Sequence, residues 1–102
     1  MAALLALMLA SAATAQSARP AAYPSDFVSN YLRNCIARSQ AQGLEVAESR
    51  QLCDCTLKQF QQQYSFNEFK QLTASARTNP QAQANLTKVG EACFEAVLFQ
   101  EN

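Results

Sequence analysis

The chain has 102 residues, with eight acidic and eight basic side chains and no histidine. With no net charge, no basic stripe and no charge block, it lacks the electrostatic footprint of a protein that binds nucleic acid or an anionic membrane. The absence of histidine removes the commonest general base and the usual partner of a nucleophilic cysteine or serine. We therefore predict a non-enzymatic protein without a bound cofactor.

The first fifteen residues have the pattern of a secretory signal peptide. A short apolar core at 4–10 is followed by small residues, and 13–15 match the A-x-A cleavage pattern, which predicts cleavage between Ala15 and Gln16. The apolar core is too short for a bilayer anchor, so we expect no stable membrane insertion after cleavage. Because no Lys or Arg precedes it, we expect a signal peptide truncated at its N-terminus, with a basic segment upstream of an internal Met.

The rest of the chain is long enough for one small domain. Residues 16–24 include Pro20 and Pro24 and predict a flexible linker, and residues 25–102 form the expected helical domain. A core of this size is marginal, and export to the periplasm or the exterior makes disulfides both available and useful.

The first predicted helix follows this linker. Ser25 is its expected N-cap, and Asp26 is well placed for the helix dipole. Gly43 is expected to end the helix as its C′ residue. Helical spacing predicts an apolar face made of Val28, Tyr31, Leu32, Cys35, Ile36 and Ser39.

The second predicted helix runs from about 44 to 64, with Glu45 and Glu48 near its start. Cys55 lies almost directly behind its apolar stripe. That stripe contains Val46, Cys53, Leu57, Phe60 and Tyr64.

The third and fourth predicted helices have the clearest start signals. Ser65 and Glu68 form a capping box, in which each side chain satisfies a free backbone amide. Asn79 is the expected N-cap of the last helix, with Pro80 at its first position. The expected core positions are Phe69, Leu72, Thr73 and Ala76 in the third helix, and Leu86, Val89, Cys93 and Val97 in the fourth.

Gly90 lies on the buried face of the fourth helix, where it predicts a close approach of another helix rather than a weak point. No segment shows strand alternation. The predicted fold is all-α: a small four-helix, disulfide-stapled bundle that follows a signal peptide.

The four cysteines allow three pairings. Cys53 and Cys55 are about 200° apart on a helix, so a bond between them would distort it. Both other pairings tie the second helix to the first and fourth. A hairpin around Gly43 favours Cys35–Cys53 with Cys55–Cys93, because Cys35 lies eight residues before the turn and Cys53 ten after it. The pairing of Cys35 with Cys55 stays open.

The C-x-C motif has an alternative interpretation as a thiol–disulfide redox or metal-handling site. Redox exchange needs a thiol with a lowered pKa, and Asp54 between the cysteines opposes formation of the thiolate. A structural zinc site would ordinarily use histidine or a C-x-x-C pair, and the chain has neither. We therefore assign no metal or catalytic residue and predict two structural disulfides.

These elements together resemble a group of small exported bacterial helical proteins without an assigned activity. The resemblance rests on Cys35, Cys53-Asp54-Cys55, the segment 63–69 and Cys93. It implies the fold and an extracytoplasmic location, and a photosynthetic source would add the thylakoid lumen. It transfers no active site. We expect an extracytoplasmic helical module that binds another protein.

Overall fold

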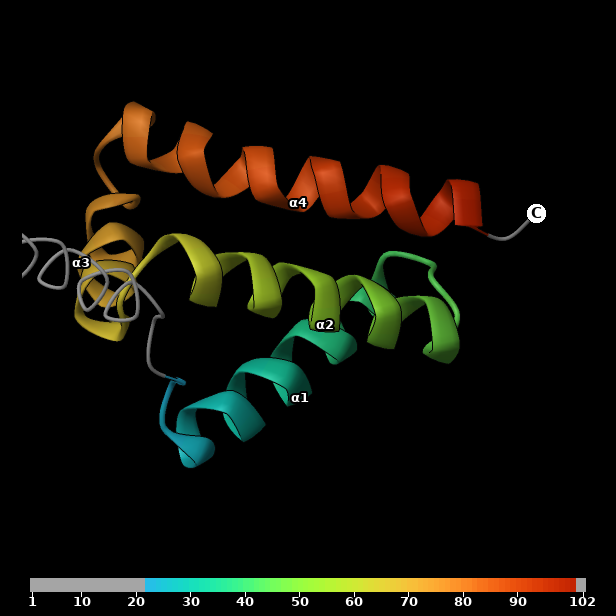
Figure 1. The fold of residues 1–102 in the computed structure, drawn as a ribbon. Helices are drawn as coiled ribbons and strands as arrows, with labels where there is room; N and C mark the ends of the chain where they lie inside the picture. The colour runs from blue at the N-terminus through green and yellow to red at the C-terminus, as the bar shows by residue number, and fades with distance from the viewer. Residues whose placement is uncertain (1–21, 101–102) are drawn as a thin grey trace, which may run out of the picture.

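The structure is a computed structural model that describes residues 22–100, and these form four α-helices and no strand (Figure 1). The predicted all-α fold is therefore confirmed. The predicted signal peptide, its cleavage site at Ala15 and Gln16, and most of the linker lie outside the described residues. The helices are α1 (Ser25–Ala41), α2 (Val46–Gln63), α3 (Phe66–Ser75) and α4 (Pro80–Gln100).

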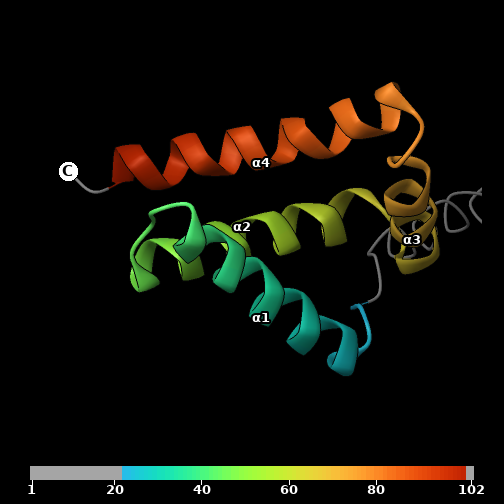
Figure 2. The same cartoon turned by 180° about the vertical axis from the view of Figure 1, so that it is seen from behind.

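α2 is the central element of the bundle. α1 and α4 lie on different sides of it in both views, and α3 crosses the end where α2 finishes (Figures 1 and 2). α2 has extensive interfaces with both α1 and α4, whereas α1 and α4 share none with each other. The fold is consequently an open three-helix arrangement that is closed at one end by α3.

α1 begins differently from the sequence prediction. Its N-cap is Pro24 rather than Ser25, and no side chain caps it. The Pro24 carbonyl oxygen accepts the first helical hydrogen bond from the Val28 amide at 3.0 Å, which makes Ser25 the first helical residue. Asp26 compensates locally, because its carboxylate accepts a bond from the Phe27 amide at 2.9 Å.

The turn between α1 and α2 matches the glycine prediction. Gly43 has φ +109°, a conformation that only glycine adopts without strain. α2 then begins with a capping box, in which the Glu48 carboxylate accepts from the Glu45 amide at 3.0 Å. Val46, predicted to belong to the core stripe, is 49% exposed because it lies in the first turn.

The two strongest start signals are confirmed. The Ser65 hydroxyl accepts from the Glu68 amide at 3.1 Å, and the Glu68 carboxylate accepts from the Ser65 amide at 2.7 Å. The Asn79 side chain accepts from the amides at positions 81 and 82. Thr73, predicted to be in the core, is instead exposed and donates its hydroxyl to the Lys70 carbonyl oxygen at 3.0 Å.

Tyr23 is the main departure from the predicted layout. The sequence places it in the linker, but the structure buries it to 4% exposure in the core. Its ring contacts those of Phe27, Phe66 and Phe69 at centroid distances of 5.3–5.9 Å. The helical domain therefore starts before Ser25. The buried core cluster contains Tyr23, Leu57, Phe60, Phe69, Val89 and Cys93.

Candidate functional site

Two disulfides hold α2 to both of its neighbours. Cys35 is bonded to Cys53 with a Cα–Cα distance of 5.9 Å, and Cys55 is bonded to Cys93 with a Cα–Cα distance of 5.8 Å. The structure thus forms the pairing favoured by the hairpin argument. Since residues two apart on a helix point to nearly opposite sides, Cys53 reaches α1 while Cys55 reaches α4.

The disulfides are a structural feature of a small core. Cys53 is 0% exposed and Cys93 is 1% exposed, so each disulfide contains one fully buried cysteine. The bonds close loops with sequence separations of 18 and 38. In the chain-entropy description such loops contribute about 3 and about 4 kcal/mol. Two disulfides in so short a chain indicate an oxidising, extracytoplasmic environment.

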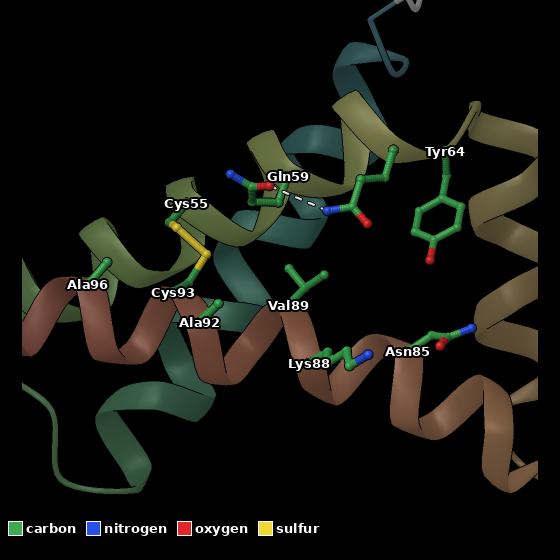
Figure 3. Close-up of a pocket in the computed structure, with 10 residues that line it drawn as sticks. Cys55, Gln59, Tyr64, Asn85, Lys88, Val89, Ala92, Cys93 and Ala96 are labelled. Carbon is green, nitrogen blue, oxygen red and sulfur yellow. Dashed lines mark hydrogen bonds between the residues drawn. A yellow bond between two sulfur atoms is a disulfide. The ribbon is translucent and has the colours of Figure 1, made fainter.

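A groove runs between α2 and α4 beside the Cys55–Cys93 disulfide (Figure 3). Its volume is about 600 Å³, and it is partly open to solvent. Val89, Ala92 and Ala96 supply its apolar lining from α4. The polar lining consists of Gln59, Gln63, Tyr64, Asn85 and Lys88.

The chemistry of this groove is that of binding. Each carboxamide offers two N–H donors and one carbonyl acceptor, which suits amide groups of a peptide. Gln59 and Gln63 already bond to each other at 3.4 Å, a long contact that a ligand could replace (Figure 3). Lys88 adds the one charge of the lining. The lining contains no carboxylate and no histidine, the side chains that most often act as general bases.

A second feature is a set of exposed apolar side chains at one end of the molecule. The large apolar residues that are exposed within 22–99 are Val46, Phe94, Leu98 and Phe99, which we call the apolar end. Figures 1 and 2 place the beginning of α2 and the end of α4 at this same end. The exposed fractions of the four side chains range from 41% for Phe94 to 73% for Phe99. These exposed residues were not predicted from the sequence, because α4 was assigned only one apolar face.

Gly90 does not have the predicted role. A Cβ atom built on it would meet nothing within 4 Å, so no other helix of the described chain approaches it closely. The predicted close approach is therefore wrong within residues 22–100. The reason is that α4 contacts α2 through Val89, Cys93 and Val97, and Gly90 lies beside that contact line.

Within residues 22–100, no group of three or more His, Cys, Asp or Glu side chains lies close enough together to hold an ion. All four cysteines are in disulfides. Between residues 22 and 100, no helix combines the length and the apolar character needed to cross a bilayer.

Comparison with known protein families, curated proteins and solved structures finds no match to this chain. The resemblance to small exported bacterial proteins therefore stays a prediction.

Proposed function

We propose that the chain is a non-enzymatic binding module of an extracytoplasmic space, the periplasm or its equivalent, and that its partner is another protein. The observation that carries this proposal is the apolar end. Large apolar side chains left in solvent at the same end of a molecule favour an interaction site there, where a partner could cover them. The groove between α2 and α4 offers a further surface, with amide groups suited to a peptide.

Disulfide exchange is less well supported than binding. Exchange requires a thiolate to reach a disulfide sulfur, and in each bond one of the two cysteines, Cys53 or Cys93, is buried, so that only the half-buried Cys35 and Cys55 offer a route of attack. A titration of free thiols in native, non-reduced protein separates the two functions. Four unreactive cysteines favour a structural role, whereas readily alkylated thiols or bound metal favour the redox or metal-handling alternative.

The binding proposal is tested by co-purification from the native envelope after mild crosslinking. We expect the wild-type chain to recover a protein partner at defined stoichiometry. The variant Val46→Ser/Phe99→Ser, which alters exposed side chains of the apolar end, should lose it. The matched control Gln71→Ser/Thr73→Ser changes two exposed residues of α3 and should retain it. Failure to recover a partner at any stoichiometry contradicts the proposal.

A further inference from the structure

We propose that the groove between α2 and α4 binds the free C-terminus of a protein partner, with the terminal carboxylate beside Lys88. This inference deepens the proposed function and rests on it, because it assigns the part of a partner that the groove takes. It follows from the charge of the lining, the hydrogen-bond donors at one end of the groove, the position of α3 and the room beside the Cys55–Cys93 disulfide.

The charge of the lining selects an anion. Lys88 is the one charged residue of the groove, and no carboxylate lies among the lining residues to oppose a negative ligand. Lys88 is exposed, and no carboxylate within residues 22–100 forms an ion pair with it. Its ammonium group therefore attracts a carboxylate and repels the positive charge of a chain's N-terminus.

Hydrogen-bond donors gather at one end of the groove. The Tyr64 ring extends from the end of α2 toward α4, where Asn85 and Lys88 lie (Figure 3). Asn85 and Lys88 are three residues apart and so share one side of α4. An ammonium group, a carboxamide and a phenol together offer more donors than acceptors, which matches the oxygens of an ionised carboxylate, since these only accept.

α3 limits the groove at this same end. α2 finishes at Gln63, α3 crosses its end, and α4 contacts both helices (Figures 1 and 2). Tyr64 belongs to the short connection between α2 and α3, so the donors lie next to this crossing. A chain that follows the groove therefore has to end or turn there. Of its two ends, only the one that carries a carboxylate suits Lys88.

The middle of the groove has room for the last residues of such a chain. α2 and α4 run in opposite directions, and the Cys55–Cys93 bond sets these two residues level (Figure 1). Lys88 thus lies about 7 Å from the disulfide along the helix axis, or about two residues of an extended chain. Ala92 and Ala96 are small, so apolar side chains of the ligand fit between them and the disulfide.

A second hollow continues the groove past the disulfide. Its volume is about 470 Å³, and it shares three lining residues with the groove. Its charged lining residues, Asp54 and Lys58, have opposite signs, so it selects neither charge. From Gln51 in this hollow to Tyr64, α2 extends about 20 Å, which is about six residues of an extended chain. A hexapeptide is therefore long enough to test the whole groove.

The probe is a pool of N-acetylated hexapeptides, random at the first four positions and ending in two residues drawn from Ala, Val and Leu. The pool is made as free acids and as C-terminal carboxamides. The oxidised chain is coupled to a resin, retained peptides are identified by mass spectrometry, and calorimetry gives their dissociation constants. We expect free acids to be retained and the matching carboxamides to bind about tenfold more weakly, because they lose the charge-assisted bond to Lys88.

Variants of the groove test the site. Lys88→Gln should weaken the binding of free acids about tenfold, and Ala92→Phe, which fills the groove, should abolish it. Arg33→Gln is the matched control, because it removes the same charge from the exposed surface of α1, on another side of α2, and should leave the dissociation constant unchanged. Circular dichroism confirms that each variant is folded. Equal effects of Lys88→Gln and Arg33→Gln overturn the site.

The other outcomes are equally definite. A pool from which no free acid is retained overturns the proposal, as does equal binding of free acids and carboxamides. Phenylacetate that binds as tightly as the peptides assigns the groove to a small organic acid and overturns a protein C-terminus as its ligand.

The proposed function fails separately. Val46→Ser/Phe99→Ser, which alters the apolar end, should bind the peptides as the wild-type chain does. A partner recovered from the envelope while no peptide is retained contradicts only the groove assignment. Retained peptides without a recovered partner contradict the apolar end as a docking surface and leave the groove assignment standing.

Discussion

The hydroxyl of Tyr23 donates to the carbonyl oxygen of Tyr64, 41 positions later in the chain, at 2.9 Å. The same hydroxyl lies 3.0 Å from the carbonyl oxygen of Phe60. Tyr64 is the C-cap of α2, so its carbonyl has no partner within the helix. A residue that precedes the first helix thus closes the end of the second, and it does so at the point where α3 begins.

Tyr23→Phe tests this closure. The substitution keeps the ring packing and removes the donor from two carbonyl groups, so the free energy of unfolding should fall by about 1–2 kcal/mol. Urea denaturation followed by circular dichroism measures the change. Tyr64→Phe is the matched control, because the Tyr64 hydroxyl lies in the solvent-open groove, and it should change stability by less than about 0.5 kcal/mol. Equal effects of both variants would contradict the role of Tyr23.

Stability should fall at alkaline pH. Burial is the largest of the causes that raise the pKa of Tyr23 to about 12. Smaller contributions come from the negative charge of Glu68 and from Tyr31 and Tyr64. Burial also raises the pKa of Tyr31 above its ordinary value, partly offset by its hydrogen bond to Thr56. Below about pH 10 these phenols are protonated in both states and have no effect on the pH dependence. Above that, the unfolded chain ionises first, so the folded state loses stability as pH rises toward 12.

Urea denaturation at about pH 8 and about pH 11 measures this loss. The double variant Tyr23→Phe/Tyr31→Phe removes both phenols and should show a shallower decline between the two pH values. An equally steep decline in this variant would assign the alkaline sensitivity to other groups.

The helix caps should differ in their contribution to stability. Ser65→Ala and Asn79→Ala each remove a side chain that accepts bonds from backbone amides, and each should cost about 1 kcal/mol. Ser25→Ala should cost less than about 0.5 kcal/mol, because the structure places Ser25 inside the first turn rather than at the N-cap. Chemical denaturation of the three variants provides the comparison. A large loss of stability in Ser25→Ala would instead indicate that Ser25 is the N-cap of α1.

The two glycines should respond to alanine with opposite signs. Gly43→Ala forces a side chain into φ +109° and should destabilise the chain by about 1 kcal/mol. Gly90→Ala adds a methyl group in open space within a helix and should stabilise the chain by about 0.5–1 kcal/mol. Thermal unfolding at low protein concentration measures both. A destabilising Gly90→Ala would indicate a close contact at that position within one chain.

Removal of the disulfide that closes the longer loop should cost more stability than removal of the other. Cys35→Ser/Cys53→Ser should lower the free energy of unfolding by about 3 kcal/mol, and Cys55→Ser/Cys93→Ser by about 4 kcal/mol. Each double variant avoids an unpaired thiol. Urea denaturation measures both losses, and a loss below about 1 kcal/mol for either would contradict a structural role for that bond.

The sequence by itself determined the local elements of this protein. The Ser65–Glu68 capping box, Asn79-Pro80 and Gly43 are signals within one turn of the chain, and the structure has each of them where it was predicted. The spacing of the cysteines also limited their pairing, because a helix fixes the relative directions of Cys53 and Cys55.

Tertiary structure decided the features that depend on what lies beside each helix. The sequence assigns Tyr23 to the linker because the residues that it bonds to, Phe60 and Tyr64, are far away in the chain. Only the fold brings them together. Whether Gly90 and Phe94 are covered depends on where α1 runs relative to α4, which no periodicity in α4 encodes. The sequence therefore specified the helices and limited the disulfides to two possible pairings, while the tertiary structure decided between these pairings and left one surface of α4 open.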